Sequence, residues 1–564
     1  MSRIIVYQLL PRLFGNSNTG CIAGGTIEQN GCGKFNDITP KALRAIRNLG
    51  ITHVWYTGVI EHTTRTDYSK YGIESTHPAT VKGEAGSPYA IKDYYDNDPD
   101  LAVNVDKRRE EFRALIERTH KAGMKVIMDF IPNHVARHYK SDNRPAGTYD
   151  FGEFDDKNAF FVGHNNFYYL GEQSYGCNID ATDCAAEPYN ESPLRATGND
   201  CFGSPSRNDW YDTVKLNYGI DYRTGNRQFS PVPNTWVKML KILQYWAAQG
   251  VDGFRCDMIE MTPVEFWQWA LPKIKAEYPE MIFIGEIYQP HIYRTFIKDG
   301  CFDYLYDKVG LYDMLKAVMS GQTSASNITY ALQQTADIRG NMLTFLENHD
   351  EQRIASDFFA TKAERALAAL IVSVAIGKQP FMLYAGQELG ERGMDKEGYS
   401  GVDGRTTIFD YWSVDTLRRW KGDGNYDTTL LTPEEKELQA FYAKLLKLCN
   451  SSEALQQGEF YDLQYANPWS DTYDSNHIYS FLRGSENELL LVVTNFSDTA
   501  RNCQVAIPEE AYAYFGLASS SKKAKATELL TGEKMSIVLN SAEKVAVNVP
   551  ANSGVIIKIN KQLN

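Results

Sequence analysis

Short apolar segments alternate along this chain with longer segments in which apolar residues recur every three or four positions. The short segments have the length of strands, and the long ones have the spacing of helices. The predicted strands are residues 4–9, 52–58, 125–130, 253–258, 283–288, 302–307, 342–347 and 381–385. The predicted helices include residues 107–122, 235–248, 263–278 and 362–376. Eight strand–helix repeats predict an α/β fold, a parallel (β/α)8 TIM barrel. The alternative is a doubly wound open sheet, but this sequence lacks the Gly-rich phosphate loop that follows the first strand of such a fold.

Two regions depart from this alternation. Residues 134–219 follow the third strand, are rich in Asn, Gly, Asp and aromatic residues, and show little helical periodicity, so they predict an inserted domain. After a last predicted helix at residues 432–448, alternating strands such as 478–482, 488–494 and 545–549 predict a C-terminal antiparallel β-sandwich. We therefore predict a catalytic barrel domain of residues 1–133 and 220–452, an inserted domain of residues 134–219 and a β-sandwich domain of residues 453–564.

Composition narrows the possible partners and the cellular location. The net charge of −13 and the absence of a Lys/Arg run argue against nucleic acid or an anionic membrane. No apolar stretch reaches the length of a membrane span. The N-terminus shows no signal-peptide cleavage pattern, which predicts a cytoplasmic protein, or a periplasmic or secreted one whose leader was removed. Among the nine cysteines, Cys21 with Cys32, and Cys177 with Cys184 and Cys201, could pair only in an oxidising compartment.

The segment V-D-G-F-R-C-D at residues 251–257 carries charged residues inside a predicted barrel strand. Because side chains alternate between the faces of a strand, Arg255 and Asp257 share one face, and Phe254 and Cys256 share the other. Buried charges persist only when they are paired or hydrogen-bonded. The segment is therefore either a structural Arg–Asp pair or part of a functional site.

Further polar residues stand at the ends of neighbouring predicted strands, where the active sites of such barrels lie. Asp257, Glu286 and Asp350 are expected to converge at one mouth, together with two histidines and an arginine. Three carboxylates this close repel one another, so at least one should have a raised pKa and donate a proton. A pair of carboxyl groups over a pocket suits glycoside hydrolysis. A metal site is the competing interpretation, although the arginine beside Asp257 would repel a divalent cation.

The chain resembles the α-amylase family of glycoside hydrolases. The fragments that carry the resemblance are D-F-I-P-N-H (129–134), V-K-L-N (214–217), G-F-R-C-D (253–257), G-E (285–286), E-N-H-D (347–350) and G-Q-E (386–388). The resemblance spans the whole chain and implies a retaining cleavage of α-linked glucans or maltooligosaccharides. It implies that Asp257 is the nucleophile, Glu286 the general acid/base, and Asp350 the carboxylate that stabilises the transition state.

The resemblance also implies substrate and metal contacts. Arg255, His134 and His349 match residues that line the subsite of the sugar being cleaved, and Tyr89 matches a tyrosine that stacks on that sugar, the alternative being a core tyrosine. Asn133 matches a side chain that often ligates a structural Ca²⁺ between the barrel and the inserted domain. Asp180, Asp183 and Asp200 could supply further oxygen ligands. The alternative is an asparagine that only hydrogen-bonds the loop backbone.

Departures from the family pattern bear on specificity. Glu260 and Met261 replace the Lys-His pair that many α-amylases carry after the nucleophile, and Gly86 replaces the aspartate that closes the pocket of oligosaccharide-trimming α-glucosidases. We expect an endo-acting α-1,4 hydrolase. Cyclomaltodextrinase, neopullulanase or α-glucosidase activity and transglycosylation remain alternatives. A catalytically inactive binding or scaffolding relative is disfavoured, because such relatives lose the carboxylates and have a membrane span.

Overall fold

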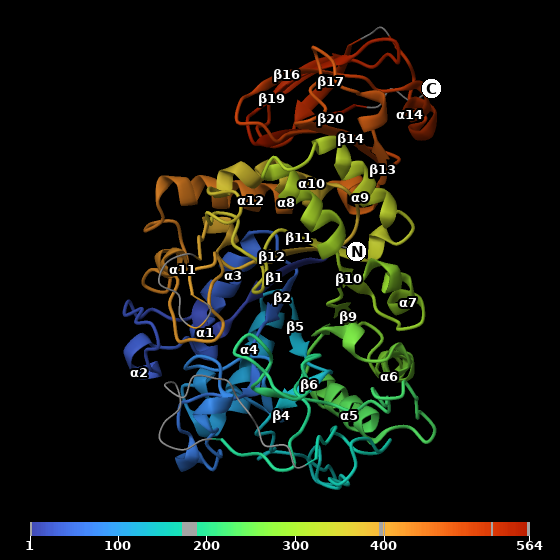
Figure 1. Cartoon of the computed structure of the whole chain (residues 1–564). Helices are drawn as coiled ribbons and strands as arrows, with labels where there is room; N and C mark the ends of the chain where they lie inside the picture. Colours follow the sequence, from blue (N-terminus) through green and yellow to red (C-terminus); the bar gives the residue numbers. More distant parts are fainter. Residues whose placement is uncertain (1–2, 172–188, 394–398, 400, 521–522, 561–564) are drawn as a thin grey trace.

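The computed structural model describes residues 3–171, 189–393, 399, 401–520 and 523–560. Eight parallel strands close into a barrel in the order β1-β12-β11-β10-β9-β8-β5-β2, which confirms the predicted TIM barrel (Figure 1). The strands are β1 (Ile5–Leu9), β2 (His53–Tyr56), β5 (Lys125–Phe130), β8 (Gly253–Cys256), β9 (Ile282–Gly285), β10 (Tyr304–Tyr306), β11 (Met342–Phe345) and β12 (Phe381–Tyr384).

Helices follow the barrel strands and cover the outside of the barrel. The main ones are α3 (Pro40–Asn48), α4 (Arg108–Lys121), α5 (Asn234–Ala248), α6 (Val264–Glu277), α7 (Tyr293–Lys298), α8 (Asp313–Met319), α9 (Ile328–Gln334), α10 (Leu367–Ala375) and α12 (Pro433–Cys449). The predicted helix at 362–376 begins as a 3-10 turn, Ala363–Ala366, before α10. The other predicted helices agree with α4, α5, α6 and α12 to within two residues.

The alternation of side chains along β8 sorts the core into two layers. Phe254 and Cys256 pack outward, in the apolar cluster shared with the surrounding helices. Arg255 points into the barrel, beside an interior cluster that includes Trp55, Tyr306 and Phe345. The parallel pairing places Asp129 of β5 opposite Arg255. The charge of Arg255 is therefore paired with a carboxylate at the end of the neighbouring strand.

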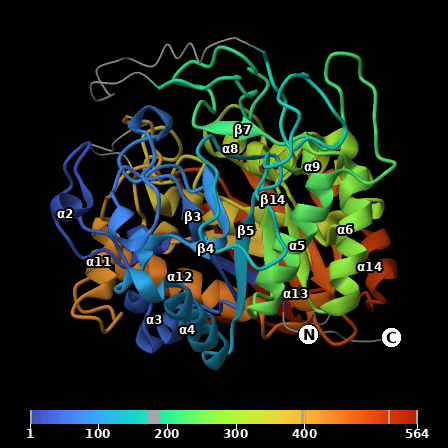
Figure 2. The same cartoon turned by 90° about the horizontal axis from the view of Figure 1, so that it is seen from below.

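The inserted segment lies over the carboxyl ends of the barrel strands. It begins with β6 (His134–Ala136), which pairs antiparallel with β7 (Thr213–Lys215) near its end. Figure 2 shows this segment gathered on one side of the barrel. The predicted Ca²⁺ ligands Asp180 and Asp183, and the cysteines Cys177 and Cys184, lie outside the described residues. Cys21, Cys32 and Cys201 are free thiols.

The C-terminal domain is mainly β and antiparallel, as predicted; its described residues also include the short helices α13 (Glu453–Gln457) and α14 (Glu509–Phe515) and a 3-10 turn at Gln464–Ala466. A six-stranded sheet has the order β13-β14-β15-β20-β17-β18, and β16 and β19 form a second sheet. Their bounds are β13 (Glu459–Asp462), β14 (Ile478–Gly484), β15 (Leu489–Asn495), β16 (Arg501–Val505), β17 (Lys523–Glu528), β18 (Lys534–Val538), β19 (Val545–Val549) and β20 (Ser553–Ile559). The domain adjoins α10 at the end of the molecule away from the inserted segment (Figure 1). Within the described residues, no helix is both long enough and apolar enough to span a bilayer.

Candidate active site

The carboxyl ends of the barrel strands and the inserted segment enclose a cavity of about 360 Å³. Five predicted site residues line it, and so does an aromatic residue from the inserted segment: Tyr89, His134, Asp257, Glu286, Asp350 and Trp210. Two more predicted residues, Arg255 and His349, are buried beneath and contact the lining carboxylates. Strands distant in sequence therefore bring the three predicted carboxylates to one mouth.

Arg255 is the electrostatic centre of the site. Its Nη1 donates to Asp257 Oδ1 at 2.8 Å, and its Nη2 lies 2.6 Å from Glu286 Oε2. Asp129 Oδ1 lies 3.5 Å from the same guanidinium, and Tyr306 accepts from its Nε at 3.1 Å. A planar guanidinium can contact several oxygens at once, so one cation orients two carboxylates that face the cavity. The Arg–Asp pair predicted from the sequence is both structural and part of the site.

The backbone turns sharply just after Asp257. Met258 has a φ of 40°, in the left-handed region that residues other than glycine rarely adopt. This turn aims the Met258 N–H at Glu286 Oε2, 3.0 Å away. Tyr288 donates to the other oxygen of Glu286, Oε1, at 2.6 Å. Both oxygens of Glu286 are thereby fixed, and a strained turn held in this way is typical of functional sites.

His349 links Asp350 to the barrel floor. Gln8 Nε2 lies 2.7 Å from His349 Nδ1, which makes Nδ1 the acceptor and places the ring proton on Nε2. From Nε2 the proton reaches Tyr89 Oη at 2.6 Å or Asp350 Oδ2 at 3.1 Å. Burial and the charge of Arg255 lower the pKa of His349 well below its usual range, so the ring is neutral. Tyr89 stacks on this ring at 5.2 Å between centroids; it lines the cavity and also packs against the apolar core, so its contact with a sugar stays a prediction.

Two of the three carboxylates, Asp257 and Asp350, hold protons unusually tightly. Burial raises the pKa of Asp257 well above its usual range, and the charges of Glu286 and Asp350 add to this while Arg255 opposes it. Burial and Glu286 likewise raise the pKa of Asp350 to about 7. Because the groups interact, their protons belong to the cluster as a whole. The site therefore keeps a proton near neutral pH, which acid catalysis at a carboxyl group requires.

The inserted segment supplies one wall of the cavity. Trp210 lies tilted against His134, with 5.0 Å between ring centroids, and both line the cavity. Burial, followed by the charges of Lys215 and Lys82, lowers the pKa of His134 to about 3, so this ring is also neutral. The sequence reasoning missed Trp210, because nothing in the aperiodic insertion placed it near the barrel. It also missed Gln8, although a glutamine inside the strand I-V-Y-Q-L was a usable signal.

Two of the departures from the family pattern have a structural explanation. The Glu260 carboxylate accepts the backbone N–H of Tyr288 at 3.0 Å, so it holds the loop after Glu286 in place. Gly86 has a φ of +77°, and a Cβ built there would lie 1.6 Å from the carbonyl oxygen of Thr63. No side chain, and therefore no carboxylate, can occupy position 86 with this backbone.

The predicted calcium ligand Asn133 lies behind His134, and its amide is fully engaged within the protein. Its Nδ2 donates to the carbonyl oxygen of Gly198 at 2.7 Å, which is the loop-bonding role left open as the alternative. Its Oδ1 accepts from Lys215 Nζ at 2.6 Å. An ammonium on the only oxygen of this side chain leaves no place there for a divalent cation. The described residues at Asn133 therefore do not fit a calcium ion.

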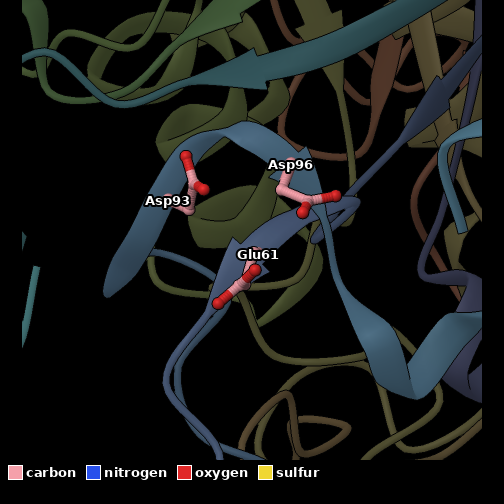
Figure 3. A group of neighbouring side chains, drawn as sticks. All are labelled: Glu61, Asp93 and Asp96. Carbon is pink, nitrogen blue, oxygen red and sulfur yellow. The ribbon is translucent and has the colours of Figure 1, made fainter. Parts of the chain in front are cut away.

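A second group of carboxylates lies in the hairpin of β3 (Ile60–His62) and β4 (Ile91–Asn97). Glu61, Asp93 and Asp96 each place one oxygen within 4.8 Å of the others (Figure 3). However, each oxygen of Asp93 already accepts two hydrogen bonds. Lys92 pairs with Glu61, and Arg108 pairs with Asp96. Although Glu61 Oε2 has no hydrogen-bond partner among the described residues, the two cations and the hydrogen bonds to Asp93 already engage all three carboxylates, so we assign no metal to the group.

Comparisons with known proteins agree with this geometry. Residues 8–458 match the family model "Alpha amylase, catalytic domain", and residues 469–560 match "Alpha amylase, C-terminal all-beta domain". The chain is 22% identical over 462 residues to Alpha-amylase 2 of Dictyoglomus thermophilum, a match that covers 80% of this chain but only 62% of that protein. It is 24% identical to the cyclomaltodextrinase of Thermoanaerobacter pseudethanolicus, over 88% of this chain and 70% of that protein. The structure of the maltogenic α-amylase AmyB from Thermotoga neapolitana superposes with a TM-score of 0.62 and 19% identity, covering 99% of this chain and 98% of that one.

Proposed function

Because the chain belongs to the α-amylase family of glycoside hydrolases, we propose that it hydrolyses α-1,4-glucosidic bonds of starch, glycogen or maltooligosaccharides with retention of the anomeric configuration. The observation that carries the proposal is the single guanidinium of Arg255, which contacts Asp257 at 2.8 Å and Glu286 at 2.6 Å at the floor of the cavity. One cation thus orients two carboxyl groups of different roles.

In the proposed first step, Asp257 attacks the anomeric carbon while the glycosidic oxygen leaves. Arg255 holds Oδ1 of Asp257, so Oδ2 is the attacking oxygen. Arg255 also stabilises the ionised form that attack requires, against the burial that raises the pKa of Asp257. The anomeric carbon forms a bond to Oδ2 as its bond to the leaving oxygen breaks.

Glu286 supplies the proton to the leaving oxygen. Its Oε2 faces the Met258 N–H and the Arg255 guanidinium, so we assign the proton transfer to Oε1, which the Tyr288 hydroxyl holds in place. In the second step, Glu286 takes a proton from water, and the water oxygen displaces Asp257 from the sugar, which restores both groups. Asp350, aligned by His349, interacts with the sugar as positive charge develops at the anomeric carbon.

We propose an internal cut, with mixed maltooligosaccharides as products. Gly86 supports this, because no carboxylate can close the pocket at that position. Action on cyclodextrins and short oligosaccharides is the second candidate. It is favoured by the V-K-L-N segment, by the loss of Lys-His after Asp257, and by the likeness to a cyclomaltodextrinase. A cytoplasmic location remains a prediction from the N-terminal sequence alone.

The roles of the two carboxyl groups can be tested with Asp257→Asn and Glu286→Gln. Each variant should fold normally and lose activity on maltooligosaccharides by several orders of magnitude. Asp252→Asn is the matched control, because Asp252 precedes the same strand but bonds to His120 and the Val126 N–H outside the cavity. Activity within tenfold of wild type in either active-site variant would sink the assignment.

Product analysis separates the two substrate candidates. NMR of early products should show the α-anomer, and iodine staining of amylose should fall well before glucose accumulates. Faster turnover of cyclodextrin or pullulan than of soluble starch would favour the second candidate instead. An inverted anomer would contradict a nucleophilic role for Asp257.

A further inference from the structure

Asn133 joins the barrel to the inserted segment. It lies three residues after the end of β5, and its backbone carbonyl accepts the N–H of Leu216 at 2.9 Å, just after β7. Its side chain bonds Gly198 through Nδ2 and Lys215 through Oδ1. A Cβ at Gly198 would lie 2.3 Å from Thr213 and 3.0 Å from His134, so the three chain segments pack closely here. One asparagine therefore fastens two parts of the insertion to the end of a barrel strand.

Lys215 is surrounded by the groups that bind cations. The residue is only 2% exposed, and its ammonium lies 2.6 Å from the Asn133 amide oxygen. The ammonium also lies 5.3 Å from the ring centre of Tyr222, within cation–π range. Asp200, one of the predicted calcium ligands, attracts the same positive charge. An amide oxygen, an aromatic face and a nearby carboxylate thus stabilise a charge that burial alone would disfavour.

The strand pairing fixes this ammonium in place. Lys215 is opposite His134 in the antiparallel pair of β6 and β7, which places it one residue from Asn133 across the ladder. A divalent ion at the same oxygen would stand next to this ammonium and be repelled by it. Chelation of Ca²⁺ should therefore not weaken this junction, whereas removal of the lysine charge should.

We propose that the Lys215 ammonium is the structural cation of this junction, and that it fastens the inserted segment to the barrel at Asn133 without Ca²⁺. The covalently attached charge does here what a bound ion would otherwise do. It aligns the Asn133 amide and, through it, the loop at Gly198 that packs against His134 in the wall of the cavity.

The first test measures thermal unfolding of the full chain in EDTA and in millimolar CaCl₂. The two melting temperatures should agree within about 1 °C, since a ligand shifts the transition only when it binds the folded state. A calcium-dependent rise that disappears in Asn133→Ser would overturn the proposal. A rise that persists in Asn133→Ser comes from an ion bound elsewhere and agrees with the lysine as the cation at this position.

The second test replaces the lysine. Lys215→Met retains much of the aliphatic volume but removes the charged donor, and it should lower the melting temperature by about 2–3 °C. Chymotrypsin should then cut within residues 134–219 faster than in wild type. Lys316→Ala is the matched control, because Lys316 also donates to a side-chain amide, Gln352 Oε1 at 2.8 Å, away from the junction. In Lys316→Ala, chymotrypsin should cut residues 134–219 at the wild-type rate.

The outcomes of the second test are decisive in both directions. If Lys215→Met melts within about 1 °C of wild type and its insertion is cut at the wild-type rate, the ammonium does not fasten the junction and the proposal fails. If Lys215→Met does not fold, Lys215→Arg keeps the charge and the donors. Recovery of the folded protein in Lys215→Arg alone then supports the proposal, and equal failure of both variants contradicts it.

Discussion

Replacing Arg255 by methionine is the most informative perturbation of this site. The change removes the cation that lies 2.8 Å from Asp257, 2.6 Å from Glu286 and 3.5 Å from Asp129, while keeping much of the apolar volume. An opposite charge at such distances lowers a carboxyl pKa by about 1–3 units. Without it, the pKa of Asp257, which burial already raises, should rise by a similar amount.

The expected loss of activity follows from that shift. Each unit of pKa above the working pH reduces the ionised fraction of the nucleophile about tenfold, so at a pH below the wild-type pKa of Asp257 the shift alone lowers kcat/KM by roughly 10- to 1000-fold. The acid limb of the pH–rate profile, where Asp257 becomes protonated, should move to higher pH. A kinetic profile between pH 4 and pH 9 on a soluble maltooligosaccharide measures both effects.

Arg255→Met should also have a lower free energy of unfolding than wild type. Breaking a buried ion pair on one side costs about 3–5 kcal/mol of unfolding free energy. Because the folded-state pKa of Asp257 lies above its unfolded value, the folded state binds more protons between those values, and stability falls as pH rises through that window. In Arg255→Met this window extends to higher pH than in wild type, so in urea unfolding the difference from wild type should widen as pH rises above the wild-type pKa of Asp257.

Arg108→Met is the matched control, because Arg108 pairs with Asp96 and is buried outside the cavity. It should lose stability without moving the acid limb of the kinetic profile. The reasoning would be refuted if Arg255→Met kept both its acid limb and its unfolding free energy to within about 0.5 kcal/mol of wild type.

Three further variants probe the surroundings of the carboxylates. Asp350→Asn removes a negative charge that raises the pKa of Asp257, so the acid limb of its residual activity should move to lower pH; a limb at higher pH would contradict the proposed coupling. Tyr288→Phe removes the donor to Glu286 Oε1 and should lower kcat by about 10- to 100-fold with KM nearly unchanged, whereas a loss confined to KM would indicate a sugar contact instead. Trp210→Ala should raise KM roughly tenfold with little change in kcat, and an unchanged KM would exclude stacking on the substrate.

The sequence predicted the barrel because each strand is a short apolar run and the helices between have a clear period. All eight predicted strands overlap those of the closed barrel. It also placed Asp257, Glu286 and Asp350 together, since parallel strands end at one edge. These inferences depend on local pattern and on a topology that the pattern nearly determines.

The contacts that complete the site were not predictable in the same way. Trp210 reaches the cavity through an insertion without periodicity, and Lys215 meets Asn133 only because β6 and β7 pair in one register. Glu260 bonds the backbone of Tyr288, a contact that its place in the sequence did not indicate. Such contacts join residues that no short sequence window contains, so they appear only once the chain is folded.

Helix α10 bears on how far this chain can be divided. Its sequence, L-A-A-L-I-V-S-V-A, is buried from Ala368 to Ala375, and it packs on both β15 and β20 of the C-terminal domain. Arg483 of that domain donates to the Ala375 carbonyl at 2.8 Å, and the Ala368 N–H donates to Asn552 at 3.0 Å. Truncation of the chain after α12 would expose the apolar surface of α10 and leave the Ala368 N–H and the Ala375 carbonyl without these hydrogen-bond partners. The barrel domain therefore depends on the C-terminal domain to cover one face of α10, and the two should not be separable without loss of stability.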